Sequence, residues 1–399
     1  MRNFKKLLSI LLVGSLVLMC SCSKSSGAKS TADTSSNNKT NVIKIGVFEP
    51  QTGENGGGGI QEVYGIRYAN QVYKTITING TEYTIDLVEV DNKSDKTEAV
   101  NAASKLVAEK VSVVLGSYGS GVSIAAGETF ADAKIPAIGC SCTNPQVTNG
   151  NPYYFRVCYL DPFQGKVMAN YANDLGYKNA AVISQLGDDY SSGLASFFKD
   201  AFTSLGGTIV SDEKFQTNQT DFKAILTNIK KANPDFIFAP SSITTAPMII
   251  QQARELGIEA KFAGGDTWEN ETVIKNANGH ADGAVLSTFY DEADTGNEET
   301  QKFVKGFKPY LDQYEKDENI PAVSALGYDA YLTAYKAIEA AQSAKGEDIQ
   351  KALVSLKLTG VTGDISFDEN GDAKKDTSYI KVVKGNKFVF EKKQQTDKK

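Results

Sequence analysis

Short apolar segments alternate with longer amphipathic ones from Val42 onward, and this alternation restricts the fold more than any other feature of the sequence. Val42–Phe48 is predicted as a strand and Ile60–Tyr73 as a helix, and the same order recurs as far as a strand near Ala284–Phe289. Strands that alternate with helices form parallel sheets with right-handed crossovers. Because the series is too long for one such unit, we expect an α/β fold of two doubly wound parallel-sheet lobes joined by a multi-strand hinge.

The break between the lobes is expected near Tyr159–Asp161. The late helices, at about Glu298–Tyr314 and Ser324–Ala344, have an apolar face that needs a sheet to cover, so we expect them to return to the first lobe. The predicted organisation of the folded part is the first part of lobe I at 42–160, the main part of lobe II at 161–290, the second part of lobe I at 291–365, a return to lobe II and the hinge at 366–392, and a disordered tail at 393–399.

The stretch Val111–Pro145 carries the clearest sign of a binding site. Its first residues, Val111–Leu115, predict a buried strand, and a glycine-rich turn and a helix follow. This order leaves free backbone amides and the positive end of a helix dipole at the carboxyl end of the strand, where Ser120 adds a hydroxyl. A second strand ends in a polar turn with Ser141 and Thr143. Together these groups suit the carboxylate of a small ligand.

The amino terminus predicts a targeting segment. Three basic residues precede an apolar run, Leu7–Met19, which is too short for a membrane span and typical of a signal peptide. The run ends in Met-Cys-Ser-Cys, which resembles a bacterial lipoprotein cleavage box, and Cys22 fits the lipidated position better than Cys20 because a small serine precedes it. We therefore expect a lipoprotein signal peptide at 1–21 and a disordered polar tether at 22–41. An ordinary secretory signal with incidental cysteines is the alternative.

Composition excludes several classes of function. The formal net charge of −6, without a basic stripe, argues against a nucleic-acid partner. The single histidine, His280, argues against His-based metal sites and against Ser-His-Asp or Cys-His catalysis. We interpret Cys140, Cys142 and Cys158 as small apolar fillers, because a CxC metal site would lack further ligands. We therefore expect no metal and no cofactor.

Two glycine-rich motifs and one acidic pair fail as catalytic signatures. No Gly-Lys-Ser/Thr follows the run Gly56–Gly59, which excludes a P-loop. The glycines of Gly116–Gly121 are spaced G-x-x-G-x-G, the wrong order for a dinucleotide fingerprint. Asp188 and Asp189 could form a carboxylate pair, but we favour a solvated helix start with Asp189 or Ser191 as its cap.

Asp266 stands in a Gly-Gly-Asp-Thr-Trp segment just past a predicted strand of the second lobe. A carboxylate at that place could face the anion site of the first lobe across a cleft. The alternative is a turn residue whose side chain accepts hydrogen bonds from its own backbone. Position and residue type alone leave both interpretations open.

Motifs along the whole chain carry a resemblance to a known family. They include, in order, Gly65–Ala69, Val90–Asn92, Gly116 with Ser120, Thr143–Pro145, Phe155–Arg156, Gln164–Gly165, Tyr190 with Gly193–Ala195, Asp235–Phe236, Gln252–Arg254, Gly264 with Asp266, and Phe367–Asp368. From about residue 42 to residue 390 the chain resembles the leucine/isoleucine/valine-binding proteins of ABC transporters, which have the type I two-lobe periplasmic-binding fold. The order and spacing of the motifs make the resemblance specific.

The resemblance implies a role for each residue of the site. Hydroxyl and amide groups at Ser120 and Thr143 are expected to hold the carboxylate of an amino-acid ligand. The ammonium is expected to contact the backbone carbonyl of Ser141, the hydroxyl of Thr143 and the carboxylate of Asp266. An aromatic residue of the second lobe, here Tyr190, closes over the ligand. Anion donors on one lobe and a carboxylate on the other match a zwitterion.

The chain departs from the family pattern around the ligand's side chain. Gly58 and a small polar residue near Ser242 stand where the family often has aromatic residues, and the cysteine pair of the first lobe is missing. Tyr118 or Trp268 could fill the resulting space. We therefore expect a roomier pocket that binds leucine, isoleucine or valine weakly, or shares them with larger or more polar amino acids.

The expected function is that of a monomeric, non-catalytic lipoprotein, anchored outside the cytoplasm to the cell membrane. It would capture an amino acid between its lobes and deliver it to an ABC permease by hinge closure. A ligand-sensing domain for a signalling partner is one alternative. An α/β enzyme is another, since fold alone does not determine function, but no nucleophile–base pair accompanies the site residues.

Overall fold

A computed structural model of the protein describes residues 41–294, 296–315 and 319–395. The predicted signal segment, Cys22 and nearly all of the predicted tether lie outside these residues, as does the end of the predicted tail. None of the helices within the described ranges is long and apolar enough to cross a membrane.

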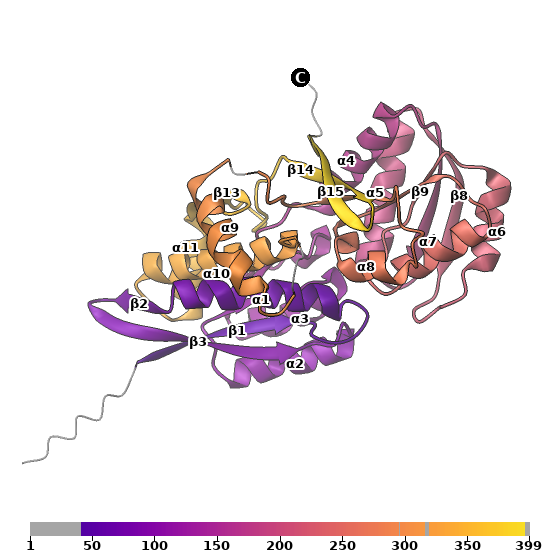
Figure 1. The fold of residues 1–399 in the computed structure, drawn as a ribbon. Helices are drawn as coiled ribbons and strands as arrows, with labels where there is room; N and C mark the ends of the chain where they lie inside the picture. Colours follow the sequence, from indigo (N-terminus) through magenta and orange to yellow (C-terminus); the bar gives the residue numbers. More distant parts are fainter. Residues whose placement is uncertain (1–40, 295, 316–318, 396–399) are drawn as a thin grey trace, which may run out of the picture. The chain divides into compact units, whose positions relative to one another are not determined.

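The first sheet has six strands in the order β2-β3-β1-β4-β5-β6 (Figure 1). Neighbouring strands are parallel, except that β2 is antiparallel to β3. The strands are β1 Val42–Glu49, β2 Thr75–Ile78, β3 Thr81–Asp91, β4 Val113–Leu115, β5 Ala137–Gly139 and β6 Tyr154–Arg156. Because β1, β4 and β5 are parallel neighbours, the loops that follow them meet at one edge of the sheet.

Helices cover both faces of this sheet, and the burial of β4 reflects this. The helices are α1 Gly56–Val72, α2 Lys96–Ala108 and α3 Ser120–Asp132. Successive side chains of a strand point to opposite faces. Val113 and Leu115 pack in the same apolar cluster as residues of α1, whereas Val114 packs with residues of α2 and α3. A strand covered on both sides is therefore apolar at every position, as the sequence pattern indicated.

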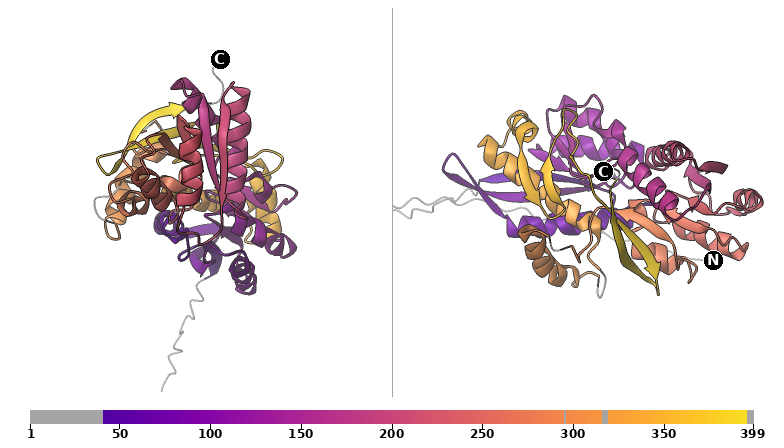
Figure 2. Two further views of the ribbon diagram at one scale, coloured as in Figure 1. Left: turned by 90° about the vertical axis from the view of Figure 1, so that its right-hand side faces the viewer. Right: turned by 90° about the horizontal axis from the view of Figure 1, so that it is seen from above.

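The second sheet has seven strands in the order β15-β14-β11-β10-β9-β7-β8, with helices on both faces (Figure 2). Its strands β14 and β15 are antiparallel to their neighbours, and the others are parallel. The elements are α4 Asp161–Asp174, β7 Asn179–Gln185, α5 Asp189–Ser204, β8 Thr208–Phe215, α6 Lys223–Ala232, β9 Phe236–Phe238, α7 Ala246–Glu255, β10 Lys261–Gly264, the short 3-10 helix η2 Asp266–Trp268, α8 Glu271–Asn276, β11 Val285–Thr288, β14 Ser378–Lys384 and β15 Lys387–Gln394. We call the parts of the chain around the first and the second sheet the first and the second lobe.

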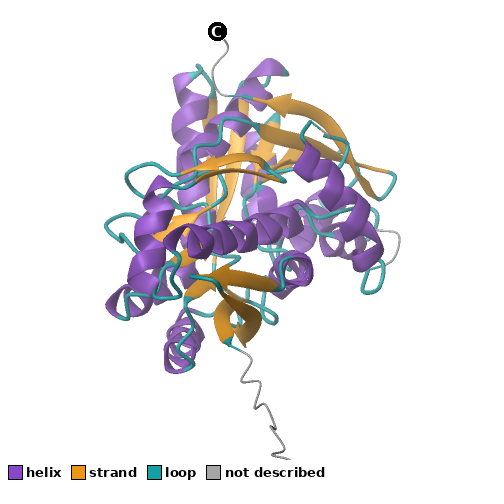
Figure 3. Cartoon of the chain, turned by 90° about the vertical axis from the view of Figure 1, so that its left-hand side faces the viewer, coloured by secondary structure: helices purple, strands orange, loops and turns teal. Residues whose placement is uncertain are grey.

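The chain passes between the two sheets three times, at residues 157–160, 289–297 and 367–377. The elements between the second and third passage are α9 Glu298–Leu311, α10 Ala322–Ala341, α11 Gly346–Ser355, β12 Lys357–Gly360 and β13 Gly363–Ser366. Helix α10 lies along α1 (Figure 1). A Cβ atom on Gly65 would lie 1.9 Å from the Ser324 carbonyl oxygen, and one on Gly327 would lie 2.3 Å from the Glu62 carbonyl oxygen. Glycine at both positions lets the two helices approach this closely. In both lobes the strands lie between helices (Figure 3).

The expected α/β fold with two doubly wound sheets is confirmed, and the differences are local. The prediction missed β2 and α8, and it began the first helix at Ile60 instead of Gly56. The glycine run belongs to the first turns of α1, where a Cβ atom on Gly59 would lie 2.0 Å from the Pro50 carbonyl oxygen. These glycines are therefore explained by close packing. The exact lobe boundaries stay a prediction.

Candidate ligand-binding site

A small cavity lies between the two lobes, where loops leave the carboxyl ends of strands in both sheets. Its volume is about 20 Å³, roughly the space of one water molecule. The residues that line it are Glu54, Asn55, Tyr118, Gly119, Ser120, Ser141, Gln185, Asp188, Tyr190, Ser242, Asp266 and Thr267. All the predicted ligand-binding residues except Thr143 are among them. The cavity thus brings together residues as far apart in the sequence as Glu54 and Thr267.

The first lobe contributes Ser120 and Ser141. Ser120 is the first residue of α3, directly after Gly119, whose φ of 113° lies in the region that favours glycine. The Ser120 hydroxyl accepts a hydrogen bond from the Asn144 amide at 3.1 Å. The Ser141 hydroxyl donates to the buried carboxylate of Glu62. This side of the cavity therefore offers a hydroxyl and the amide end of a helix, as predicted for an anion site.

Thr143 is the predicted residue that does not reach the cavity. It is fully buried, and its hydroxyl lies close to the equally buried carboxyl group of Asp161. The backbone joins the same two residues, since the Asp161 amide donates to the Thr143 carbonyl at 2.9 Å. Thr143 lies behind the cavity wall, and contact with a ligand would need a local shift of this loop.

The second lobe contributes Asp266 and the groups that hold it. Its Oδ1 accepts hydrogen bonds from Gln164 Nε2 and from the Tyr190 hydroxyl, both at 2.9 Å. Burial raises the pKa of Asp266 to about 6, although the two hydrogen bonds oppose this shift. The Tyr190 hydroxyl also lies 3.3 Å from the Thr267 hydroxyl. The side chain of Asp266 is therefore oriented by other side chains, which an ordinary turn residue would not require.

Two buried acids behind Ser141 were missed by the sequence analysis. Glu49 ends β1 and accepts a hydrogen bond from the Tyr118 amide at 2.6 Å, and Glu62 lies on the buried face of α1. Burial, followed by the charge of Glu62, raises the pKa of Glu49 well above its ordinary value, and burial raises that of Glu62 to about 7. A weak signal was present in the sequence, because Glu49 directly follows the apolar positions of β1 and Glu62 lies beside apolar residues of α1.

Glu49, Glu62 and Cys140 are also the group of described residues that could hold a metal ion, with ligand atoms within 4.8 Å of one another. All three are fully buried, and the raised pKa values of the two acids suit a proton shared between neighbouring carboxyl groups. The three cysteines within the described ranges are buried and free, as expected of apolar fillers.

Tyr118 occupies the space left by the missing aromatic residue. A Cβ atom on Gly58 would lie 2.4 Å from the Tyr118 ring, which is 3% exposed. Trp268 packs instead against Gly264, its near neighbour in sequence. Of the two residues that could have filled the gap, Tyr118 does so.

Polar residues line the remaining wall, and one of them corrects a prediction. Asp188, not Asp189 or Ser191, caps α5, since its carboxylate accepts a hydrogen bond from the Ser191 amide at 2.6 Å. Its side chain also reaches the cavity, together with Glu54 of the first lobe and Gln185. The acidic pair was predicted to be solvated. The sequence does not indicate that the start of α5 lies beside the other lobe.

The lobes contact each other around the cavity. Asn144 Nδ2 donates to the Asp189 carbonyl at 2.7 Å, and Lys96 forms an ion pair with Asp189 at 2.8 Å. On another side, Asn270 Nδ2 donates to Gln61 Oε1 at 3.2 Å. Since a cavity of this size cannot hold an amino acid, side chains or lobes must move before a ligand enters.

The loop that carries Ser141 is held by the buried Arg156 at the end of β6. The Arg156 guanidinium donates to the carbonyls of Cys142 at 2.7 Å and Asn144 at 2.6 Å. Its Nε donates to the carboxylate of Asp372 at 2.6 Å. Charge-assisted hydrogen bonds of this kind fix the loop between β5 and the next short helix.

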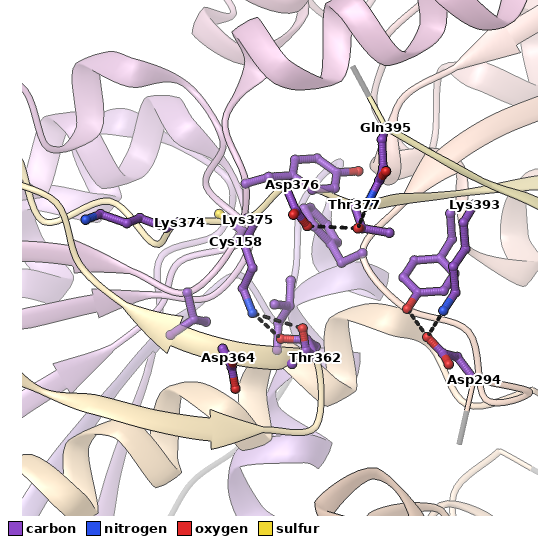
Figure 4. Close-up of a pocket in the computed structure, with 16 residues that line it drawn as sticks. Cys158, Asp294, Thr362, Asp364, Lys374, Lys375, Asp376, Thr377, Lys393 and Gln395 are labelled. Carbon is purple, nitrogen blue, oxygen red and sulfur yellow. Dashed lines mark hydrogen bonds and ion pairs between the residues drawn. The ribbon is translucent and has the colours of Figure 1, made fainter. Parts of the chain in front are cut away.

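A larger cavity, of about 530 Å³, lies where the chain passes between the sheets (Figure 4). Two of its lysines have partners within the lining, since Lys375 Nζ donates to the Thr362 carbonyl at 2.9 Å and Lys393 pairs with Asp294 at 2.6 Å. These two lysines are therefore engaged by the protein itself. The smaller cavity, with its convergent polar groups, is the better candidate site.

Comparison with known proteins places the chain among solute-binding proteins. Residues 42–387 match the periplasmic binding protein family. The Leu/Ile/Val-binding protein homolog 1 of Brucella abortus strain 2308 is 30% identical over 344 residues, which cover 83% of this chain and 88% of that protein.

Solved structures agree with this match. The leucine binding protein LivK of Thermotoga maritima superimposes with a TM-score of 0.82 at 34% identity, over 88% of this chain and 99% of that chain. LivJ of Streptococcus pneumoniae, a branched-chain amino acid transporter substrate binding protein in complex with isoleucine, gives a TM-score of 0.78 at 28% identity, over 88% of this chain and 100% of that chain. Both likenesses extend over both lobes.

Proposed function

Because the chain belongs to the periplasmic binding protein family, we propose that it captures an α-amino acid between its lobes and delivers it to the permease of an ABC transporter. The names of the related proteins refer to leucine, isoleucine and valine, which supports a branched-chain or related amino acid as the ligand of this chain. The similarity to these binding proteins covers both lobes, and both lobes contribute residues to the cavity.

The observation that carries this proposal is the convergence of opposite polar groups on one cavity. The second lobe contributes the oriented carboxylate of Asp266, and the first contributes Ser120 at the amide end of α3. A zwitterionic amino acid needs both kinds of group. Each hydrogen bond to a charged group contributes about 1.5–3 kcal/mol. Burial raises the pKa of Asp266, so an ammonium group in contact with it would favour the ionised carboxylate.

The proposed roles follow the chemistry of each group. The Ser120 hydroxyl and the first amides of α3 hold the ligand carboxylate, and the Ser141 carbonyl and Asp266 hold the ammonium. Tyr190 closes over the ligand while its hydroxyl keeps Asp266 in place. Thr143 joins the carboxylate contacts only after its loop has shifted.

A non-catalytic role is part of the proposal. The single histidine, His280, is not among the residues that line the cavity, and no cysteine or lysine of the described ranges lines it either. The lining hydroxyls therefore have no lining histidine or lysine to activate them as nucleophiles, and the Ser141 hydroxyl donates to the carboxyl group of Glu62. Capture and release of an unchanged solute fits these groups better than covalent chemistry.

The place of action is proposed from the amino terminus. Lipidation of Cys22 would anchor a monomeric protein outside the cytoplasm, with the polar segment that follows as its tether. An ABC permease in the same membrane would then receive the amino acid when the lobes open.

A thermal-shift screen of the twenty amino acids against the purified full chain in mild detergent tests the proposal. A ligand at a hundred times its Kd stabilises the folded state by about 2.7 kcal/mol. We expect stabilisation by at least one L-amino acid, and none by the matching D-isomer. If no amino acid raises Tm, the proposed function is wrong.

A further inference from the structure

The part of the cavity lining other than Asp266 and its hydrogen-bond partners includes a strongly polar wall. It is formed by Glu54 and Asn55 of the first lobe and by Gln185, Asp188 and Ser242 of the second. Among the residues described, no valine, leucine, isoleucine, methionine or phenylalanine lines the cavity. A site built for leucine would bury apolar surface, at about 25 cal/mol per Å² of contact. This wall offers little of that surface.

Two carboxylates dominate this wall. Glu54 and Asp188 come from opposite lobes and are both half-buried. Burial, followed by the charge of Asp188, raises the pKa of Glu54, and burial, followed by the charge of Asp189, raises that of Asp188. The hydrogen bond from Gln185 to Glu54 only partly offsets this cost. The wall therefore carries two carboxyl groups from opposite lobes, Asp188 held by the Ser191 amide at the start of α5 and Glu54 by the hydrogen bond from Gln185.

Lys96, a cation near this wall, is engaged elsewhere. Lys96 forms its ion pair with Asp189 at 2.8 Å and donates to the Gly187 carbonyl at 3.2 Å. The charge of Lys96 lowers the pKa of Asp188, but Lys96 also forms an ion pair with Asp189. Three carboxyl groups, those of Glu54, Asp188 and Asp189, therefore lie near the ammonium group of Lys96.

We propose that the ligand of this site is an amino acid whose side chain carries a positive charge, held between Glu54 and Asp188. This inference rests on the proposed function, because Asp266 and Ser120 must hold the α-ammonium and α-carboxylate. An apolar side chain in the same place would remove water from two carboxylates without replacing it, which is costly. A cationic side chain would replace that water with charge-assisted hydrogen bonds.

Calorimetry with L-lysine and L-norleucine tests the proposal, because norleucine has the carbon chain of lysine without its ammonium group. With the purified full chain in mild detergent we expect lysine to bind at least about ten-fold more tightly, the effect of one added hydrogen bond between charged groups. The combined substitution Glu54→Gln and Asp188→Asn should remove that difference by weakening lysine, and norleucine should bind no less tightly than to the unchanged chain, because its carbon chain no longer removes water from two carboxylates. Asparagine caps helices as well as aspartate does, so α5 should still form.

A matched control is Asp95→Asn, since Asp95 caps α2 through the amides of Thr97 and Glu98 and does not line the cavity. It should leave lysine binding unchanged. If the double variant does not fold, Glu54→Gln alone serves, because Glu54 lies in a loop.

The outcomes separate the two proposals. Norleucine binding as tightly as lysine would overturn the cationic side chain and leave amino-acid binding intact. Lysine binding that survives both substitutions would overturn the assignment to Glu54 and Asp188. If no amino acid of the screen binds, the proposed function fails, and this inference fails with it.

Discussion

Replacing Asp266 by asparagine is expected to make the unliganded protein more stable and the ligand much weaker. The substitution keeps the size of the side chain and the oxygen that accepts from Gln164 and Tyr190. It removes only the charge. One substitution is thus expected to raise the stability of the unliganded protein and to lower its affinity for the ligand, and both effects test the role of Asp266.

The size of the stability effect follows from the pKa of Asp266. Burial raises this pKa from an ordinary 3.8 to about 6, and each pH unit corresponds to about 1.4 kcal/mol. A raised carboxyl pKa favours the folded state below pH 3.8, and that contribution is lost as the pH rises through 6. At pH 7 the ionised carboxylate therefore costs about 3 kcal/mol. Asp266→Asn should recover up to this amount at pH 7 and almost none at pH 3.5.

The effect on binding has the opposite sign. The ligand ammonium loses its charged partner, and a broken buried pair costs about 2–5 kcal/mol. The affinity should fall by roughly 30-fold to several thousand-fold. For the unchanged protein, affinity should also fall as the pH drops below about 6, because protonated Asp266 cannot pair with an ammonium group.

Urea denaturation at pH 7 and pH 3.5, together with calorimetry of the ligand found in the screen, measures both effects. Asp86→Asn is the control, since Asp86 is an exposed member of a surface ion pair with Lys74 and neither change should exceed a few tenths of a kcal/mol. A variant that is less stable than the unchanged protein at pH 7, yet binds normally, would refute this account of Asp266.

Three further predictions concern other parts of the chain. Cys22→Ser should release the protein from membranes into the soluble fraction on fractionation, whereas Cys20→Ser should not. Tyr118→Ala should lower the unfolding free energy by about 3 kcal/mol and, in a thermal-shift screen, newly admit larger side chains such as phenylalanine; unchanged selectivity would show that the ring does not border the pocket. Asp372→Ala leaves the buried guanidinium of Arg156 without its carboxylate and should cost about 3–5 kcal/mol in urea denaturation, so a loss under 1 kcal/mol would contradict the buried pair.

The architecture was predictable because buried parallel strands leave a strong signal. Runs such as Val113–Leu115 are apolar at every position, and the helices between them have one apolar face. Strand β2 was missed because Thr75–Ile78 alternates polar and apolar residues and pairs only at an edge. Glycine propensity argued against a helix at Gly56–Gly59, but close packing against neighbouring groups overrides propensity there.

The residue pattern alone predicted the site best shortly after the ends of strands, as at Ser120, Ser141 and Asp266, which all reach the cavity. Tyr190 and Ser242 were found through the family resemblance, and they line the cavity too. Asp188 and Glu54 were not assigned to it, because their position depends on how one lobe faces the other. Such a contact has no periodic signal in the sequence, since it joins residues more than a hundred positions apart.

The bonds of Arg156 also set an order of assembly. Its carboxylate partner Asp372 comes 216 residues later in the chain, and chains are synthesised from the amino terminus. All six strands of the first sheet can thus exist before the loop with Ser141 has its final restraint. Until Asp372 has been synthesised, the loop with Ser141 is held by the Arg156 contacts to the carbonyls of Cys142 and Asn144, while the guanidinium still lacks its carboxylate partner.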